Sequence, residues 1–341
     1  MVLEISPFNT MTSRLHSLIS GFSGKRILVI GDIAIDKYLI GRPTRIAREA
    51  PVLILEVQEE WFIPGGATNV AVNASTLEAE VFLAGIIGDD LPGRQLRQAI
   101  GNMHIHQEGL VIDPQCTTPT KTRIMAGSPQ IVQQHIVRID RGNTSGICEQ
   151  SKRSMMNYIE QALPAVDAVV LSDYENGVIS PQIIETCVSA AQRLNKVVVA
   201  DSHGSLFRFQ GVTALTPNQP EAELTLGMTI TCQADLEEAG QQLLARSHVK
   251  GVLITRGSEG MSLFEIGRPP MHLPIHRLPN ASEIVDTNGA GDTVASTFTL
   301  ALAAGASMSE AAYIANAAAA LVVQRLGCAS NSLKDLMCLI A

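Results

Sequence analysis

The sequence D-T-N-G-A-G-D, residues 286–292, lies between a short β-rich stretch and the apolar run of residues 293–304. Two of its residues, Gly289 and Gly291, have no Cβ, so the backbone can turn sharply and an anion can approach it closely. The apolar run has the length of a helix, whose free N–H groups and positive dipole end would point at that anion. The stretch therefore predicts a strand–turn–helix junction that binds an anion.

Asp292 belongs to the first turn of this expected helix. A carboxylate beside an anion site is electrostatically unfavourable, so its presence there indicates a function. Accepting a proton from a substrate hydroxyl is one such function. A phosphate cradle with an adjacent base is what phosphoryl transfer to an alcohol requires. The alternative interpretation is that Asp292 only caps the helix, which is common for Asp.

Composition narrows the class of protein. The chain has 341 residues, 46% hydrophobic and only 4% aromatic, with 27 Gly, which suits an α/β protein with buried parallel strands. The net charge of −8 argues against a nucleic-acid partner. Six cysteines occur without any C-x-x-C pair, as expected in a reducing cytoplasm. We also expect no membrane association, because no apolar run reaches membrane-spanning length and residues 1–20 do not resemble a signal peptide.

Strand-like and helix-like segments alternate along the chain. This order predicts a parallel sheet that helices cover on both faces. The expected strands are residues 26–30, 81–87, 168–172, 197–201, 214–216 and 251–255, with a further strand end at 283–285. The expected helices are residues 67–77, 91–100, 181–194, 232–245, 293–304 and 309–325.

Two stretches do not follow this alternation of strands and helices. Residues 37–61 show little helical pattern, with an exposed or edge strand expected at 52–57, and residues 120–140 alternate between apolar and polar side chains. We interpret them as a small β lid, formed by about residues 37–64 and 110–140, over the carboxyl edge of the sheet where open α/β folds bind ligands. The alternative is a pair of ordinary surface hairpins.

Two common nucleotide-binding motifs are missing from the sequence. It contains no G-x-x-x-x-G-K-[ST], which excludes a Walker-type phosphate loop. The first expected strand is followed by G-D-I-A-I-D, residues 31–36, rather than by G-x-G-x-x-G. The main motif that would indicate a nicotinamide-binding Rossmann enzyme is therefore missing. A nucleotide-dependent kinase of another architecture remains.

The chain resembles the ribokinase-like carbohydrate kinases, known as the PfkB family, over about residues 25–329. D-T-N-G-A-G-D matches the C-terminal signature of that family. Further matches are G-D-I-A-I-D (31–36), P-G-G-A-T-N-V-A (64–71), G-D-D-L-P-G-R (88–94), T-P-N-Q-P-E (216–221) and T-R-G-S-E-G (255–260). The resemblance implies one kinase domain over residues 1–341, a three-layer α/β sandwich with a mostly parallel central sheet and a small β lid. It also implies ATP-dependent phosphorylation of a sugar with Mg²⁺.

Within this family the chain is most similar to the bacterial D-glycero-D-manno-heptose 7-phosphate kinases. The likeness is carried by I-A-R-E-A-P-V (46–52), K-T-R-I (121–124), V-R-I-D (137–140) and A-N-A-A-A-A-L-V-V (315–323). One segment departs from the pattern: D-S-H-G, residues 201–204, stands where those kinases usually have D-P-K-G. His203 thus replaces a lysine, which leaves a different sugar open as the substrate.

The resemblance also implies roles for individual residues around the signature. Asp292 would be the catalytic base, and Asn288, Gly289, Ala290 and Gly291 would form the anion hole. Sugar hydroxyls would be bound by Asp36, Gly65, Gly66 and Asn69, since carboxylates accept and amides also donate hydrogen bonds. The alternative for Asp36 is a solvated strand end.

Other residues are implied on the nucleotide side. Asn218 and Glu221 would organise hydrated Mg²⁺ and the triphosphate, with Glu221 acting through water; the alternative is a helix capping box. Thr255, Gly257 and Gly260 would lie beside the nucleotide and Asn316 beside the adenine, although a helical Asn can simply face solvent.

Three cations, Lys121, Arg123 and Arg138, lie in the expected lid strands. They would hold a phosphate already present on the sugar, and the alternative is a solvated strand face. We therefore expect an ATP-dependent kinase for a sugar or sugar phosphate that forms a homodimer through its lid strands. A kinase for a neutral sugar or nucleoside, and a non-catalytic sugar-binding regulator, are the competing hypotheses.

Overall fold

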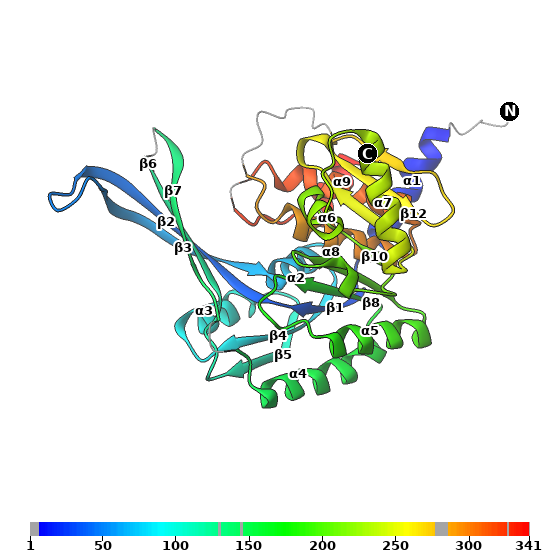
Figure 1. Ribbon diagram of the computed structural model, residues 1–341, viewed down its shortest axis with the longest axis horizontal. Coiled ribbons are helices and arrows are strands. Elements are labelled where there is room, and N and C mark those ends of the chain that lie inside the picture. Colours follow the sequence, from blue (N-terminus) through cyan, green and yellow to red (C-terminus); the bar gives the residue numbers. More distant parts are fainter. Residues whose placement is uncertain (1–6, 129–130, 144–145, 277–285, 326, 341) are drawn as a thin grey trace.

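The computed structural model describes residues 7–128, 131–143, 146–276, 286–325 and 327–340. These residues form a nine-stranded sheet and a separate four-stranded sheet (Figure 1). Strand order in the larger sheet is β13-β12-β11-β10-β9-β8-β1-β4-β5, parallel from β11 to β5 and antiparallel at β12 and β13. Its strands are β1 (Arg26–Gly31), β4 (Glu80–Gly88), β5 (Ile105–Asp113), β8 (Ala168–Asp173), β9 (Val197–Ser202), β10 (Ala214–Leu215), β11 (Gly251–Thr255), β12 (Met261–Glu265) and β13 (Met271–Leu273).

Helices cover both faces of this sheet, as expected. Alternate side chains of a strand point to opposite faces, and in β1 Ile27 and Val29 join one core while Leu28 and Ile30 join the other. The first core contains residues of α1 (Pro7–Ser20), α2 (Ala67–Thr76), α3 (Leu91–Ile100), α8 (Ala290–Ala303), α9 (Met308–Val322) and α10 (Leu333–Leu339). The second contains residues of α4 (Glu149–Ala162), α5 (Pro181–Leu194), α6 (Gln219–Leu226) and α7 (Gln233–Ser247). The three-layer α/β architecture is confirmed.

The smaller sheet is the expected lid. It has the order β3-β2-β6-β7 and consists of β2 (Ile33–Ile46), β3 (Leu53–Gly66), β6 (Thr120–Ser128) and β7 (Ile131–Arg141). Figure 1 shows these strands extending away from the body of the molecule. One boundary was wrong: residues 110–113 belong to β5 of the larger sheet, so the second lid segment begins at Thr120 rather than near residue 110.

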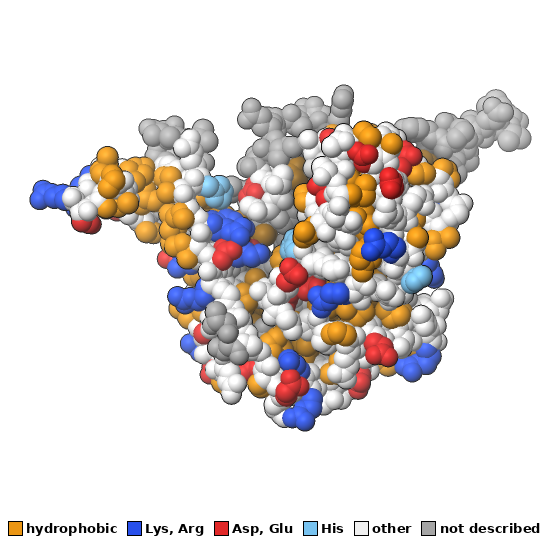
Figure 2. All heavy atoms as spheres, viewed as in Figure 1, with side chains coloured by type: hydrophobic (Ala, Val, Ile, Leu, Met, Phe, Trp, Pro, Cys, Tyr) orange, Lys and Arg blue, Asp and Glu red, His pale blue; other side chains and the backbone are white. Residues whose placement is uncertain are grey.

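Apolar side chains remain exposed on the lid, where Figure 2 shows them along the projecting strands. Strand β3 is an edge strand, as expected for residues 52–57. A small sheet cannot bury both of its faces by itself. The large hydrophobic residues exposed here are Ile46, Val52, Leu53, Val57, Ile136, Val137 and Ile139.

Some elements differ from the expectations. Helix α9 ends at Val322 rather than at residue 325, because the Val323 carbonyl accepts the N–H of Asp286 at 3.2 Å. Helix α4 was not predicted, since its sequence is mostly polar and only Ser151, Met155, Met156 and Ile159 are buried. The strand end expected at residues 283–285 lies outside the described residues. Within the described part of the chain, no helix combines the length and apolarity needed to cross a membrane.

Candidate active site

Two adjoining pockets are lined by residues from the carboxyl ends of the parallel strands and from α8. The first pocket, of about 510 Å³, lies among residues of α6, β11, α8 and α9. The second pocket, of about 310 Å³, lies between α8 and lid strands β2 and β6. Both are lined by Asn218, Thr255, Thr287 and Gly291, so the two pockets meet at the start of α8.

The N-terminus of α8 is built by the glycines of the signature sequence. Gly289 is the N-cap, with φ of 78°, a conformation that costs glycine little. A Cβ on Gly289 would also come within 3.3 Å of the Cys328 Cα, whereas one on Gly291 would meet no described atom within 4 Å. The Gly291 and Asp292 N–H groups, in the first turn of the helix, have no partner within it. This geometry supports the predicted anion site.

Asp292 is the third residue of α8 and is only 4% exposed. Its Oδ2 accepts a hydrogen bond from the Asn69 amide at 2.7 Å, and its Oδ1 accepts one from the Tyr174 hydroxyl at 2.7 Å. Burial raises the pKa of Asp292 to about 6, although both hydrogen bonds lower it. The capping interpretation was wrong, because Gly289 is the N-cap and the carboxylate contacts other elements.

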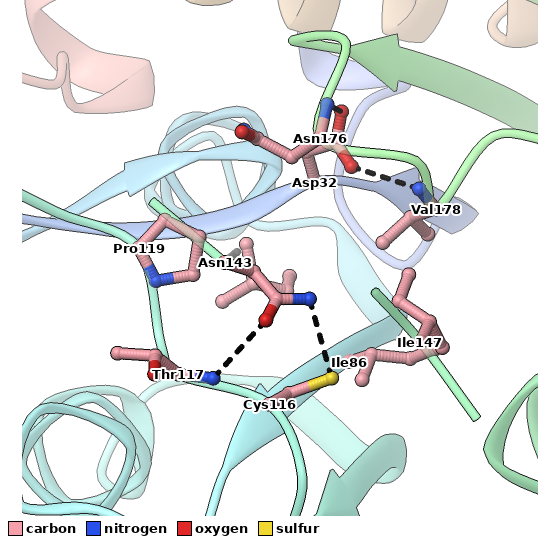
Figure 3. Close-up of a pocket in the computed structure, with 10 residues that line it drawn as sticks. Asp32, Ile86, Cys116, Thr117, Pro119, Asn143, Ile147, Asn176 and Val178 are labelled. Carbon is pink, nitrogen blue, oxygen red and sulfur yellow. Dashed lines mark hydrogen bonds between the residues drawn. The ribbon is translucent and has the colours of Figure 1, made fainter. Parts of the chain in front are cut away.

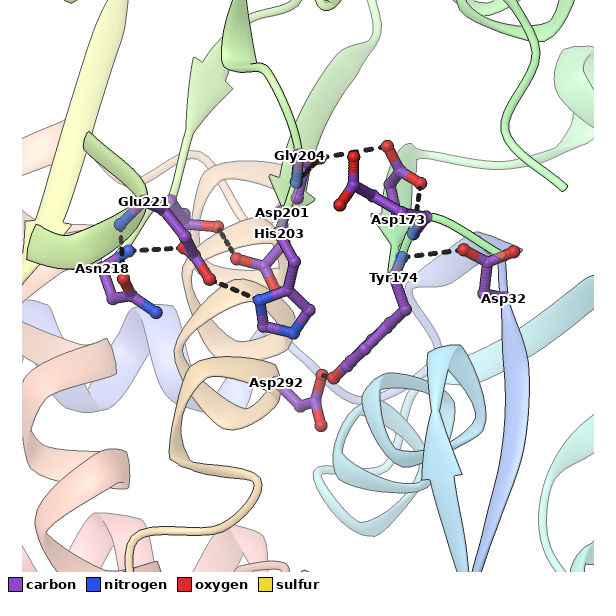
Figure 4. Close-up of polar contacts among 12 residues, drawn as sticks. Asp32, Asp173, Tyr174, Asp201, His203, Gly204, Asn218, Glu221 and Asp292 are labelled. Carbon is purple, nitrogen blue, oxygen red and sulfur yellow. Dashed lines mark hydrogen bonds and ion pairs between the residues drawn. The ribbon is translucent and has the colours of Figure 1, made fainter. Parts of the chain in front are cut away.

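Further ionisable groups lie beside Asp292 (Figure 4). Asp201, at the end of β9, has its pKa raised to about 7 by burial and by the charges of Glu221 and Asp292. His203 forms an ion pair through Nδ1 with Glu221, and this hydrogen bond raises the pKa of His203. Sequence reasoning assigned no role to Asp201 or Tyr174. Their positions at the carboxyl ends of β9 and β8 were the available signal, because ligands bind at that edge of such sheets.

Asn218 and Glu221 form the capping box of α6. The Asn218 side chain accepts the Glu221 N–H at 2.8 Å, and Glu221 Oε2 accepts the Asn218 N–H at 2.8 Å. The capping interpretation is therefore confirmed. Glu221 also lines the second pocket, and its Oε1 pairs with His203. The box thus holds the Glu221 carboxylate in the second pocket, next to Asn218, which lines both pockets.

The three lid cations all line the second pocket. Arg123 and Asp36 form a buried ion pair, with side chains 7% and 5% exposed, so Asp36 is not a solvated strand end. The exposed Arg138 pairs with Asp140 at 2.6 Å. The Lys121 Nζ lies 4.7 Å from the centroid of the Tyr174 ring, and within the described residues Lys121 forms no ion pair.

The residues expected around the sugar contribute in different ways. Gly66 lines the second pocket, and Gly65 leaves room for Asp36, since a Cβ there would overlap its carboxylate. The Asn69 amide hydrogen-bonds to Asp292. In this structure Asn69 therefore supports the expected base, Asp292. A contact between Asn69 and sugar hydroxyls stays a prediction.

Most of the residues expected around the nucleotide line the first pocket. Thr255, Gly257, Gly260 and Asn316 all line it. Asn316 is 6% exposed and its amide donates to the Pro274 carbonyl at 2.7 Å, so the solvent-facing alternative was wrong. Asn288, expected in the anion hole, and Glu221, expected on the nucleotide side, line the second pocket and not the first.

Comparison with known proteins identifies the chain's family. Residues 25–335 match the model described as "pfkB family carbohydrate kinase". The chain belongs to the pfkB family of carbohydrate kinases. Among curated members, it is 39% identical over 319 residues to the "Bifunctional protein HldE" of Caulobacter vibrioides, covering 93% of this chain and 64% of that protein. It is 36% identical over 314 residues to the protein of the same name from Helicobacter pylori, covering 92% and 65%. The chain thus spans less than two thirds of the length of these relatives.

Solved structures of other proteins share the fold. Escherichia coli phosphofructokinase-2 in complex with potassium superposes with a TM-score of 0.74 at 20% identity, over 93% of this chain and 98% of that one. Arabidopsis thaliana ribokinase complexed with ribose and ATP gives a TM-score of 0.70 at 20% identity, over 93% and 99%. At these identities, the likeness shows the ribokinase-like fold alone.

Proposed function

We propose that this chain transfers the γ-phosphoryl group of ATP to a hydroxyl of a sugar phosphate similar to heptose 7-phosphate. The observation that carries the proposal is the junction of the two pockets at Gly291, directly before Asp292 of the second pocket, with a base and an anion site side by side. The first pocket would take ATP. The second, lined by Lys121, Arg123 and Arg138, would take the phosphorylated sugar. The HldE relatives match over nearly the whole of this chain, which supports the heptose branch.

The geometry suggests how the reaction proceeds. The Asp292 carboxylate takes the proton of the acceptor hydroxyl, and the hydroxyl oxygen forms a bond to the γ-phosphorus. The bond from the γ-phosphorus to the β,γ-bridging oxygen breaks, and ADP leaves with that electron pair. The N–H groups at the start of α8 stabilise the charge on the transferred phosphoryl group. With a pKa of about 6, Asp292 is mostly ionised at neutral pH.

The residues present fit a hydrated Mg²⁺ associated with ATP. Burial and neighbouring carboxylates raise the pKa of Asp201 to about 7, and a nearby cation would relieve this repulsion. The described residues contain no cluster of three or more His, Cys, Asp or Glu side chains that could hold a metal directly. Glu221 would therefore hold the ion through water, with the triphosphate supplying ligands. When bound, Mg²⁺ neutralises charge on the phosphates.

A coupled ADP-release screen over sugars and sugar phosphates, with ATP and magnesium, tests the proposal. We expect the highest kcat/KM with a phosphorylated sugar, and a strong loss of turnover in Asp292→Asn. The Asn variant keeps the shape of the side chain but cannot accept a proton. Turnover near that of the wild-type protein in Asp292→Asn would refute Asp292 as the base, and no turnover with any sugar phosphate would refute the acceptor class.

A kinase for a neutral sugar is the second candidate. It is favoured because Arg123 and Arg138 already pair with carboxylates of the protein. Of the three lid cations, Lys121 alone then remains to bind an anionic acceptor. A far higher kcat/KM for a neutral hexose or pentose in the same screen would decide for it. The retained Asp292 and anion site disfavour a non-catalytic regulator.

The lid also supports a homodimer. Its exposed apolar side chains, including Val57 at 57% and Ile139 at 54%, would be buried against the lid of a second copy. We place the enzyme in the cytoplasm, where the six cysteines, all free in this structure, would stay reduced.

A further inference from the structure

Tyr174 follows directly after β8 and contacts several groups of the active site. Its hydroxyl donates to Asp292 Oδ1 at 2.7 Å. Lys121 lies over its ring, and the His203 ring meets it edge-on with centroids 4.4 Å apart. Burial and the charge of Asp292 raise the pKa of Tyr174 well above its ordinary value, so the hydroxyl keeps the proton that it donates.

The loop that carries Tyr174 is held by a buried carboxylate from another strand. Asp32, just after β1, is 1% exposed. Its Oδ2 accepts the N–H of Tyr174 at 2.8 Å and of Asn176 at 3.0 Å, and its Oδ1 accepts that of Val178 at 3.1 Å (Figures 3 and 4). Hydrogen bonds to a charged group are among the stronger ones in proteins. Asp32 therefore replaces the regular backbone pairing that this loop lacks.

A second carboxylate, Asp173, holds the same loop from its N-terminal end. It accepts the Glu175 N–H at 3.0 Å and an Arg208 N–H at 2.9 Å. Glu175 and Gly177 both have positive φ, of 60° and 90°. A non-glycine residue in this region costs free energy and persists only where its surroundings determine it. The loop is thus built to hold one conformation.

Asp292 depends on such support because a carboxylate can rotate about its Cβ–Cγ bond. Its two oxygens are held from two elements, Oδ2 by Asn69 of α2 and Oδ1 by Tyr174 of the loop. Each oxygen can accept more than one hydrogen bond, so a substrate hydroxyl can still approach. Without Tyr174, only Asn69 of these two donors would orient the base.

We propose that Tyr174 is a positioning residue for phosphoryl transfer, which orients the Asp292 carboxylate and is itself held in place by Asp32. The inference rests on the proposed function, because it assigns Tyr174 a task in that reaction. Removal of the Tyr174 hydroxyl also changes the titration of Asp292 when no substrate is bound.

The first test is Tyr174→Phe, with Tyr158→Phe as the matched control because the buried Tyr158 hydroxyl has no hydrogen-bond partner among the described residues. We expect Tyr174→Phe to lower kcat by about 10- to 100-fold, the range for one hydrogen bond to a charged group, with both KM values within about twofold. The acidic limb of the kcat–pH profile should move to higher pH, because the Tyr174 hydrogen bond lowers the pKa of Asp292. The other titratable groups that face Asp292 stay unchanged in this variant; they are His203, Lys121, Asp201 and Cys328. A purely structural role would not move the limb.

The second test is Asp32→Asn, which leaves every side chain in contact with Asp292 unchanged. We expect a loss of kcat similar in size to that of Tyr174→Phe, and a double variant little worse than either single one, since both changes act through one contact. Fully additive losses, or a kcat in Tyr174→Phe equal to that of Tyr158→Phe, would overturn the proposal. If Asp32→Asn does not fold, the comparison of Tyr174→Phe with Tyr158→Phe tests the proposal by itself.

A third measurement distinguishes a failure of this proposal from a failure of the proposed function. Carboxyl ¹³C NMR of aspartate-labelled protein follows the titration of Asp292 without substrate, with Asp292→Asn identifying its signal. We expect the midpoint to rise in Tyr174→Phe and to stay unchanged in Tyr158→Phe. An unchanged midpoint in Tyr174→Phe refutes the contact even in an active kinase. A raised midpoint supports the contact even if no acceptor is phosphorylated, in which case the proposed function alone fails.

Discussion

The burial of the ion pair between Arg123 and Asp36 predicts how much the free energy of unfolding falls when one partner is removed. Arg123 of β6 and Asp36 of β2 are 7% and 5% exposed, and Arg123 also lies 5.3 Å from the centroid of the Tyr38 ring. Arg123→Met removes the charge but keeps an unbranched side chain. It leaves the Asp36 carboxylate buried beside the Cys328 thiol, 3.5 Å away, which is a weak donor. Removing one partner of a buried ion pair costs about 3–5 kcal/mol, so we expect the free energy of unfolding to fall by that amount.

Urea unfolding at one protein concentration measures this effect. Far-UV circular dichroism reports on the whole chain, and the fluorescence of Trp61, the only tryptophan, reports on the lid, where its ring stacks on Tyr38. Arg138→Met is the matched control: Arg138 and Asp140 are 53% and 48% exposed, and an exposed pair contributes about 0–1 kcal/mol.

The double variant Arg123→Met, Asp36→Asn checks the cause of the loss. It removes the uncompensated charge, so it should regain part of the stability lost in Arg123→Met. A loss in Arg123→Met no larger than in Arg138→Met would refute the reasoning, because the pair would then behave as if it were solvated. Any rise in KM for Arg123 variants has to be judged against this instability, so Lys121 is the better position for testing acceptor binding.

Four further outcomes are expected. Asp292→Asn should lower kcat by about 10²–10⁴-fold with little change in nucleotide affinity, measured by steady-state kinetics and nucleotide titration; unchanged turnover would exclude it as the base. In wild-type protein kcat should rise with pH through about 6, because the ionised carboxylate is the active form and the pKa of Asp292 is about 6, whereas a flat profile from pH 5 to 7 would contradict this. Activity should vanish in excess EDTA and return with magnesium, since the triphosphate has to supply ligands to the ion. Light scattering should show a dimer at micromolar concentration, and Val57→Lys, on the exposed lid, should favour the monomer.

Local sequence patterns were sufficient for part of the backbone of this protein. The short β-rich run at residues 26–30 and the apolar run after Asp292 correspond to β1 and α8. The glycines of D-T-N-G-A-G-D indicated the turn before α8, because only local sterics decide whether a backbone can adopt positive φ. The asparagine and glutamate of T-P-N-Q-P-E form a capping box, which is also a local interaction.

Only the tertiary structure decided which polar atoms meet when their residues lie far apart in the sequence. Asp292 is held by residues 223 and 118 positions away, Asn69 and Tyr174. Arg123, expected to meet a substrate anion, forms a buried ion pair with Asp36. A spacing rule reaches only one or two turns of a helix or the neighbouring residues of a strand. Partners brought together by packing leave no such pattern, and the low dielectric of a buried site then makes their pairing decisive.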